Sequence, residues 1–513
     1  MQRVRVRRWT AVLVGVVICL TGAGTVLAEP PDVIRQGGVR DVDTFDPAKT
    51  DGSGYFAICN LFDQLVRFKQ GPDVTTLELE NDLAESYEVS ANGTLYTFHL
   101  RNGVLFHKGY GELTSEDVKF TFERILDPTF ASPQRSVFSV IKEIRTPDKY
   151  TVEIELKTPS AGFMGSAIAY RGGYILSKRA VQEMGDAGTA LNPIGTGPYV
   201  LESRVPGQSM TFVANYEYWR GVADIKRVVL NVIPDETTIL TALLAGDLDY
   251  ALLEMPEMIQ AARQDPNLNL MISPGETRGM VVNCNTIPNR KVRQALLFAL
   301  DRQLIIESVY FGIGELIEQT PLAQHLFGYE PYLAEYTYSP ETAVRLLQEA
   351  GYSAANPLVV RLLLRPADIG LATACAGFWE EVGVQVVIDV QQTAAFAALR
   401  SGKADAWDLM ITTPTRPDPA LLLPQLYSPN IPSPNYARYN QVDNVIDAYN
   451  ATSGSDTATL ELLLSQIQMI VSVDLPNLYV LDTMKVTCTR KGLAGDVPNT
   501  HFWLMLWYFM HWE

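Results

Sequence analysis

The chain has 513 residues, of which 47% are hydrophobic and 19% charged, and its formal net charge at pH 7 is −17. This length suggests about three compact units, at roughly 150 residues each. The acidic balance argues against nucleic acid and anionic membrane surfaces as partners, because both would be repelled. It does not identify a small ligand, since net charge reports mainly on solubility.

The N-terminus has the pattern of an export signal. Four arginines within residues 3–8 precede an apolar run over residues 11–20, and a segment with several small residues ends at Ala28. The run is too short to span a bilayer, which needs roughly 20 apolar residues. We therefore predict a signal peptide over residues 1–28 that is cleaved near Ala28. The bulky Ile18 before Cys19 argues against a lipoprotein signal.

Short strands and helices alternate in the first half of the chain. Residues 87–106 alternate between polar and apolar, which predicts a hairpin that turns at residues 101–103. A helix is predicted to begin after Thr114, whose hydroxyl is a suitable N-cap, and to stop at Asp127–Pro128. Residues 150–156 alternate again and predict a further strand.

The second half has the same mixture. Ser339 as N-cap, Pro340 at the first helical position and Gly351 after the last one predict a helix over residues 339–351. Residues 291–300 have helical periodicity, the β-branched run 384–390 suits a buried strand, and residues 408–411 suit another. The alternation of short strands and helices predicts an α/β protein.

Ten sequence blocks have distinctive composition and spacing. They lie at residues 46–47, 83–87, 96–107, 116–120, 192–199, 215–221, 233–235, 243–249, 292–302 and 339–352. The fifth and sixth read Asn-Pro-Ile-Gly-Thr-Gly-Pro-Tyr and Asn-Tyr-Glu-Tyr-Trp-Arg-Gly. In order and spacing, from about residue 32 to 440, the blocks resemble those of extracytoplasmic solute-binding proteins that serve ABC importers of oligopeptides, dipeptides and nickel.

This resemblance implies an α/β fold with two lobes joined by a hinge and an extra α/β subdomain inserted in lobe I. The expected division gives residues 29–67, 194–277 and 481–513 to lobe I, residues 68–193 to the inserted subdomain and residues 278–480 to lobe II. It also implies a periplasmic, noncatalytic receptor without cofactor or metal. Such a receptor closes over a small solute as a monomer and delivers it to a membrane permease and ATPase complex.

The segment over residues 411–419 resembles the loop that carries, in peptide-binding relatives, a tryptophan and an aspartate that recognises the peptide α-ammonium group. The tryptophan position holds Thr412 here and the aspartate position holds Thr415. A hydroxyl accepts a hydrogen bond but supplies no charge, and Arg416 beside it disfavours a cation. The loop therefore argues against an ordinary free peptide N-terminus, unless Asp418 substitutes for the missing acid.

A second candidate ligand group is Arg171, which lies in an apolar and glycine-rich segment next to Tyr170. Its guanidinium could hold a carboxylate while Tyr170 stacks on an organic ligand. The alternative is a surface arginine before a strand at residues 174–176. If Arg171 and Arg416 both face the cleft, the ligand is an anion or bears a carboxylate. A peptide, a chelated metal, an opine-like compound and a sugar acid all stay open.

Two other functions compete with solute delivery. One is a secreted hydrolase that uses Asp247 and Asp249, which would share one face if their segment were a strand. The other is a receptor that reports solute occupancy to a membrane sensor. No zinc-protease, nucleophile-elbow or Walker motif is present, so we predict no catalytic residues.

The cysteines and the C-terminus leave structural alternatives open. The four cysteines beyond the signal, Cys59, Cys284, Cys375 and Cys488, are either buried thiols or form one or two disulfides. The aromatic tail over residues 502–512 has no basic residue to hold lipid headgroups, so we expect it to pack onto lobe I.

Overall fold

The structure is a computed structural model that describes residues 32–50, 54–70, 78–322, 327–331, 333–402, 405–413, 419–454, 456–496 and 506–513. The predicted signal peptide lies outside these residues, and so do three predicted ligand residues, Thr415, Arg416 and Asp418. No helix in the described ranges is long and apolar enough to cross a membrane.

One large mixed sheet runs through the molecule in the strand order β10-β11-β12-β1-β13-β19-β14-β18-β16-β17, with β15 pairing off this path to β19. The bounds are β1 Val33–Gly38, β10 Tyr199–Val205, β11 Ser209–Ala214, β12 Arg227–Val232, β13 Tyr250–Leu253, β14 Leu268–Val282, β15 Gly314–Glu315, β16 Val359–Leu364, β17 Gln385–Val390, β18 Leu409–Thr412 and β19 Asn477–Arg490. Strand β1 is parallel to β12 and β13, and β16 is parallel to β17 and β18.

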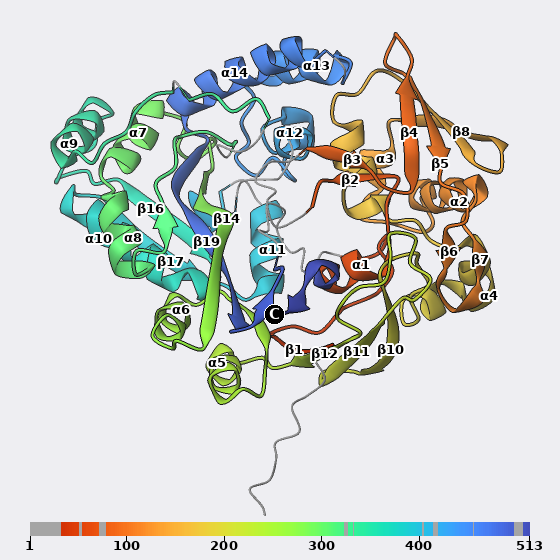
Figure 1. The fold of residues 1–513 in the computed structure, drawn as a ribbon. Coiled ribbons are helices and arrows are strands. Elements are labelled where there is room, and N and C mark those ends of the chain that lie inside the picture. The colour runs from red at the N-terminus through yellow and green to blue at the C-terminus, as the bar shows by residue number, and fades with distance from the viewer. Residues whose placement is uncertain are drawn as a thin grey trace, which may run out of the picture.

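The two long strands β14 and β19 connect the halves of this sheet. They pair antiparallel from Leu268 opposite Arg490 to Val281 opposite Asn477. The register shifts between Pro274 and Thr277, and again between Arg278 and Gly279. Such irregularities bend a strand and increase its twist, so the sheet changes direction here. Figure 1 shows β14 and β19 running beside each other between the helices on the left and the strands at the bottom.

A separate four-stranded sheet has the order β4-β5-β9-β8, with β4 Ala84–Val89, β5 Leu95–Leu100, β8 Ile141–Asp148 and β9 Thr151–Leu156. Helix α2, Ser115–Leu126, packs on it through apolar residues such as Phe122, and the predicted capping box of Thr114 and Asp117 is confirmed. The predicted hairpin turn is wrong. The hairpin of β4 and β5 turns at residues 90–94, and the turn at 101–103 leads instead to β6, Leu105–Phe106, which pairs with β7, Gly111–Glu112.

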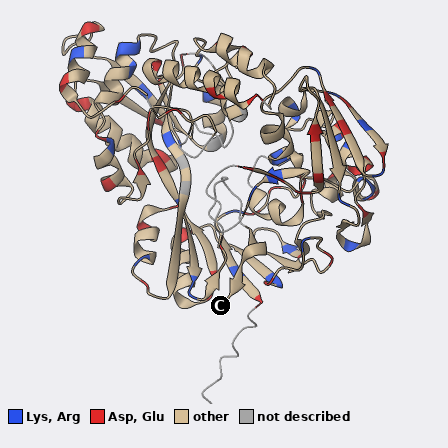
Figure 2. Ribbon diagram, turned by 45° about the horizontal axis from the view of Figure 1, so that its top comes forward, with Lys and Arg blue, Asp and Glu red and all other residues tan. Residues whose placement is uncertain are grey.

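Most of the remaining helices cover the two halves of the large sheet, and two of them, Arg135–Phe138 and Lys178–Thr189, contact α2 beside the smaller sheet. The remaining helices are α1 Tyr55–Leu61, α3 Arg135–Phe138, α4 Lys178–Thr189, α5 Glu236–Ala245, α6 Pro256–Ala262, α7 Arg290–Phe298, α8 Arg302–Val309, α9 Pro340–Glu349, α10 Ile369–Glu381, α11 Thr393–Ser401, α12 Pro419–Leu422, α13 Asp443–Ala451 and α14 Thr457–Asp474. Helices α7 and α9 confirm two predictions, and the Ser339 side chain accepts a hydrogen bond from Thr342 as an N-cap should. Charged residues are spread over these outer helices and the smaller sheet (Figure 2).

The prediction of a buried strand at residues 384–390 is wrong in one respect. The strand exists as β17, but it is an edge strand and its Val387 side chain is 52% exposed. A β-branched run favours a strand without showing how many neighbours the strand will have.

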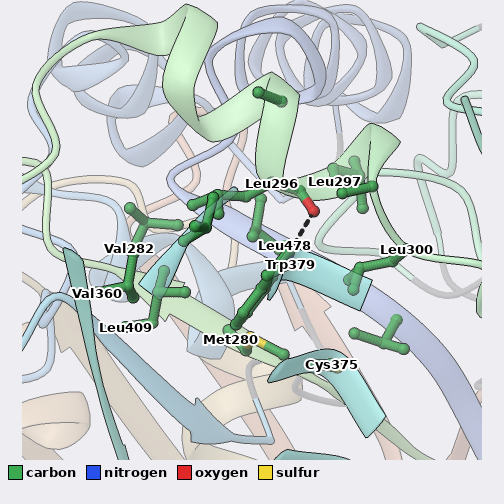
Figure 3. Packing of buried hydrophobic residues seen from close by; sticks show 14 of the residues in the cluster. Met280, Val282, Leu296, Leu297, Leu300, Val360, Cys375, Trp379, Leu409 and Leu478 are labelled. Atoms are coloured by element: carbon green, nitrogen blue, oxygen red, sulfur yellow. Dashed lines mark hydrogen bonds between the residues drawn. The ribbon is translucent and has the colours of Figure 1, made fainter. Parts of the chain in front are cut away.

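The core of the C-terminal half is built around Trp379 of α10 (Figure 3). Its indole Nε1 donates a hydrogen bond to the Leu296 carbonyl over 2.7 Å. Met280 from β14 and Leu409 from β18 are fully buried in the same cluster. The helices α7 and α10 and the central strands therefore share one apolar interior.

The C-terminal residues pack into the other half, as expected. Trp507 is fully buried, and its Nε1 donates to Gln36 Oε1 over 2.7 Å while its backbone N donates to Asn60 Oδ1. Two short ribbons complete the fold. They are β2, Val66–Phe68, with β3, Leu79–Asn81, and β20, Leu493–Ala494, with β21, His511–Trp512.

Candidate functional site

Arg171 is clamped between two aromatic rings. Its guanidinium carbon lies 4.8 Å from the ring centroid of Tyr55 and 5.3 Å from that of Tyr170. Tyr55 is only 4% exposed, and its hydroxyl has no hydrogen-bond partner among the described residues. Arg171 itself is half-buried. Stacking on two rings restricts the orientation of its guanidinium plane.

The local backbone explains why the sequence is glycine-rich here. The Gln64 side chain donates to the Tyr170 carbonyl over 2.7 Å and so anchors the residue before Arg171. A β-carbon on Gly173 would lie 1.8 Å from the Ile168 carbonyl oxygen, so no other residue fits. The segment before it, Phe163–Ile168, forms a π-helix, an irregularity that is frequent at functional sites.

The predicted ligand loop begins at the carboxyl end of β18. Thr412 pairs with Gly279 of β14, and Thr413 accepts a long hydrogen bond of 3.4 Å from Arg278 Nη1. Because Thr415, Arg416 and Asp418 lie outside the described residues, their predicted contacts remain untested. Thr412 is half-buried at the point where the described part of the loop ends.

Two arginines that sequence reasoning missed share one buried acid at this loop. Asp368 is 5% exposed, with Arg278 Nη1 at 3.6 Å from its Oδ1 and Arg365 Nε at 3.6 Å from its Oδ2. Arg365 Nε and Asp368 Oδ2 both lack a hydrogen-bond partner among the described atoms. These three side chains thus bring two guanidinium groups and one carboxylate together.

The topology explains why these residues meet. Strands β16 and β18 are parallel neighbours, with Leu363 opposite Met410. Arg365 and Thr413 follow the carboxyl ends of these two strands. Ligands of open α/β sheets bind beyond such carboxyl ends. The sequence signal that could have identified Arg365 is its position directly after the apolar strand at residues 359–364.

The motifs at residues 192–199 and 215–221 converge on a different residue, Asp63. This buried carboxylate accepts hydrogen bonds from Thr196 Oγ1 at 2.9 Å, Trp219 Nε1 at 3.1 Å and Tyr218 OH at 3.2 Å. Desolvation raises the pKa of Asp63 to about 7. The network joins segments that are far apart in the chain, so the motifs are structural.

His107 completes this junction. It is buried, its Nε2 donates to the Gly197 carbonyl over 2.9 Å, and burial lowers the pKa of its imidazole to about 4. A neutral ring that is bound to backbone on both sides belongs to the fold. Within the described ranges, no three His, Cys, Asp or Glu side chains are grouped so that they could hold a metal ion.

The proposed hydrolase pair is wrong. Asp247 is exposed in the turn after α5, whereas Asp249 is buried. Asp249 accepts hydrogen bonds from Arg35 Nε and Nη2, both at 3.0 Å, and lies 3.2 Å from Arg490 Nη1. A carboxylate held by two arginines is a structural ion pair. The four cysteines beyond the predicted signal form no disulfide within the described part of the chain, and three of them are buried.

The fold and these positions are those of a class of binding protein. Residues 78–433 match the family model described as bacterial extracellular solute-binding proteins, family 5, middle. The chain belongs to this family.

Similar proteins agree with this assignment. Heme-binding protein A of Haemophilus influenzae is 30% identical over 489 residues, covering 89% of this chain and 88% of that protein. The dipeptide-binding protein of Escherichia coli is 28% identical over 518 residues, with 94% of each chain covered. The solved structure of HbpA2 from Haemophilus parasuis is 27% identical, covers 94% of this chain and 100% of its own, and superposes with a TM-score of 0.81. The predicted fold, a two-lobed α/β periplasmic binding protein, is confirmed.

Proposed function

We propose that this protein is the substrate-binding component of an ABC importer, exported to the periplasm by a signal peptide cleaved near Ala28. It captures a small solute between two lobes and delivers it, as a monomer, to a membrane permease and ATPase complex. Family membership supports this proposal, as do relatives named for heme and dipeptide binding. We keep the predicted division, with lobe I at residues 29–67, 194–277 and 481–513, the insertion at 68–193 and lobe II at 278–480.

The solute is peptide-like and bears a carboxylate. The observation that carries this proposal is the pair Arg278 and Arg365 around Asp368, at the start of the ligand loop. Two guanidinium groups at this position favour an anionic solute group, because a guanidinium binds a carboxylate through paired hydrogen bonds. Arg171, stacked between Tyr55 and Tyr170, is the second candidate carboxylate ligand.

A free ammonium group adds little to recognition. Thr415 stands where peptide-binding relatives have an acid, and Arg416 follows it. Asp368 is already shared by two arginines, so a ligand cation would have to compete with both for it. A blocked N-terminus should therefore be tolerated and a blocked C-terminus should not.

Isothermal titration calorimetry with two matched probes tests this proposal. N-acetyl-alanyl-alanine keeps the carboxylate without an ammonium group, and alanyl-alanine amide keeps the ammonium without a carboxylate. We expect binding of the first and none of the second. Arg365→Gln and Arg171→Gln should each weaken binding by about tenfold or more, since a charge-assisted bond contributes roughly 1.5–3 kcal/mol.

Arg179→Gln serves as the control, because the Arg179 side chain is 64% exposed on α4 and its carboxylate partner in the described part of the chain is Glu183 of the same helix. It should leave the affinity unchanged. Preferential binding of the amide would contradict the carboxylate proposal. If neither probe binds, the same assay is repeated with another carboxylate-bearing solute.

A further inference from the structure

Two turns from distant parts of the chain meet in this structure. One is the turn at residues 90–94 between β4 and β5, and the other connects α13 to α14. The β-carbon that Gly93 lacks would lie 2.6 Å from Ser453 Oγ and 3.0 Å from Ser453 Cβ. Next to it, a β-carbon on Gly454 would lie 3.3 Å from the Ala161 carbonyl oxygen. Gly93 therefore lies against the Ser453 side chain, and Gly454 lies against the Ala161 backbone.

Both turns are held firmly by their own hydrogen bonds. In the first, Gly93 N donates to the Ser90 carbonyl over 2.8 Å and Leu95 N donates to Ser90 Oγ over 2.9 Å. In the second, Thr452 Oγ1 donates to the Ala448 carbonyl over 2.8 Å, and the Asp456 side chain caps α14. These hydrogen bonds restrict the backbone of each turn, so neither turn changes its conformation easily when the two are in contact.

The contact joins two separate apolar interiors. The hairpin belongs to the four-stranded sheet and its core with α2, whereas α13 and α14 pack in the cluster around Trp407. Ala161 packs against that second cluster, and the π-helix at Phe163–Ile168 contacts α12. In Figure 1 the tip of the β4–β5 hairpin rises on the right, beyond the end of α13.

We propose that the hairpin turn with Ala161, on one side, and Ser453 with Gly454, on the other, form a closure contact that sets how often the ligand-free protein is closed. The proposal rests on the proposed function, since the two sides fall in the inserted subdomain and in lobe II. The contact includes none of the candidate ligand residues. Its effect on the apparent affinity should therefore be the same for every solute.

The chemistry of the contact suits such a role. Gly93, Ala161, Ser453 and Gly454 all have small, uncharged side chains or none, so we expect a small change in either partner to open the contact. A protein whose binding-competent state is only partly populated binds with an affinity reduced by that fraction. Opening the contact should thus weaken apparent affinity without removing any ligand contact.

A rescue experiment separates this contact from simple strain. Gly93→Ala places a β-carbon against Ser453 and also strains the turn, because Gly93 has φ +70°. The double variant Gly93→Ala with Ser453→Gly keeps the strain and removes the clashing atoms. Gly103→Ala is the matched control, since Gly103 has φ +75° and nothing within 4 Å of an added β-carbon.

The readout is the distance between spin labels on the exposed positions Glu88 and Glu461, measured in ligand-free protein with Cys284→Ser to avoid a third label. We expect Gly93→Ala to lose the short-distance population and to bind N-acetyl-alanyl-alanine at least threefold more weakly. The double variant should recover both, and Gly103→Ala should match wild type. Identical distance distributions for wild type and Gly93→Ala, or no recovery in the double variant, would overturn the closure contact.

Failure of the proposed function has a different signature. If wild type binds no solute at all, the receptor assignment fails, whereas the label distances in ligand-free protein still decide whether the contact controls closure.

Discussion

Replacing Trp507 should show that the C-terminal tail is part of the folded core. The side chain is fully buried, its ring packs edge-on against Tyr199 with centroids 5.5 Å apart, and the centroid of Phe212 lies 4.8 Å away. Truncation of a buried tryptophan to alanine costs about 3–5 kcal/mol through lost contacts and the cavity left behind. The variant also removes the 2.7 Å hydrogen bond from the indole to Gln36 Oε1, which contributes about 0.5–1.5 kcal/mol.

The assay is urea denaturation followed by circular dichroism, with Trp507→Phe and Trp512→Ala alongside. We expect Trp507→Ala to lower the free energy of unfolding by about 4 kcal/mol. Trp507→Phe should cost less, since it keeps most of the ring contacts. Trp512 is only half-buried, so its truncation should cost the least. A loss below about 1 kcal/mol for Trp507→Ala would refute the packing argument and reopen the membrane-anchor interpretation of the tail.

Three further predictions concern buried polar groups. Asp249→Asn should destabilise the protein by about 3 kcal/mol, because it leaves Arg35 without its carboxylate, whereas exposed Asp247→Asn should change stability by less than about 0.5 kcal/mol. Burial raises the pKa of Asp63 to about 7, so the folded chain holds this proton at a pH where the unfolded chain has lost it. The stabilisation is complete below about pH 4 and is lost as the pH rises through 7, and Asp63→Asn should flatten the fall in melting temperature between pH 5 and 8. The four thiols should react with Ellman's reagent fully only after unfolding, and a reductant should not shift the melting temperature.

Local signals predicted the elements well wherever a cap or a stop residue was present. The helix after Ser339 begins and ends close to its predicted bounds, because the N-cap side chain and Gly351 act within a few residues of the chain. The prediction of the hairpin was wrong. The turn at Arg101–Gly103 exists, but the strand after it, β6, pairs with β7 and not with β5. Strand pairing is a tertiary choice that a local turn signal does not settle.

Only part of the candidate site, too, could be predicted from the sequence. Arg171 could be singled out because a charged residue stands alone in an apolar, glycine-rich segment. The structure places the rings of Tyr55 and Tyr170 around it, and its role as a ligand residue stays a prediction. The group of Arg278, Arg365 and Asp368 could not, since it forms only when β14, β16 and β18 are neighbours. Asp249 was misjudged because its partners Arg35 and Arg490 come from opposite ends of the chain.

The central claim is that this protein holds an intact carboxylate-bearing solute, and native mass spectrometry of the exported protein, purified without refolding, tests it most directly. The account predicts a population that carries one noncovalent solute per chain, which leaves on gentle denaturation with a mass that fits a carboxylate compound and does not change on renewed incubation with the protein. A chain that never carries such an adduct, or that converts the recovered compound into something else, would contradict the account.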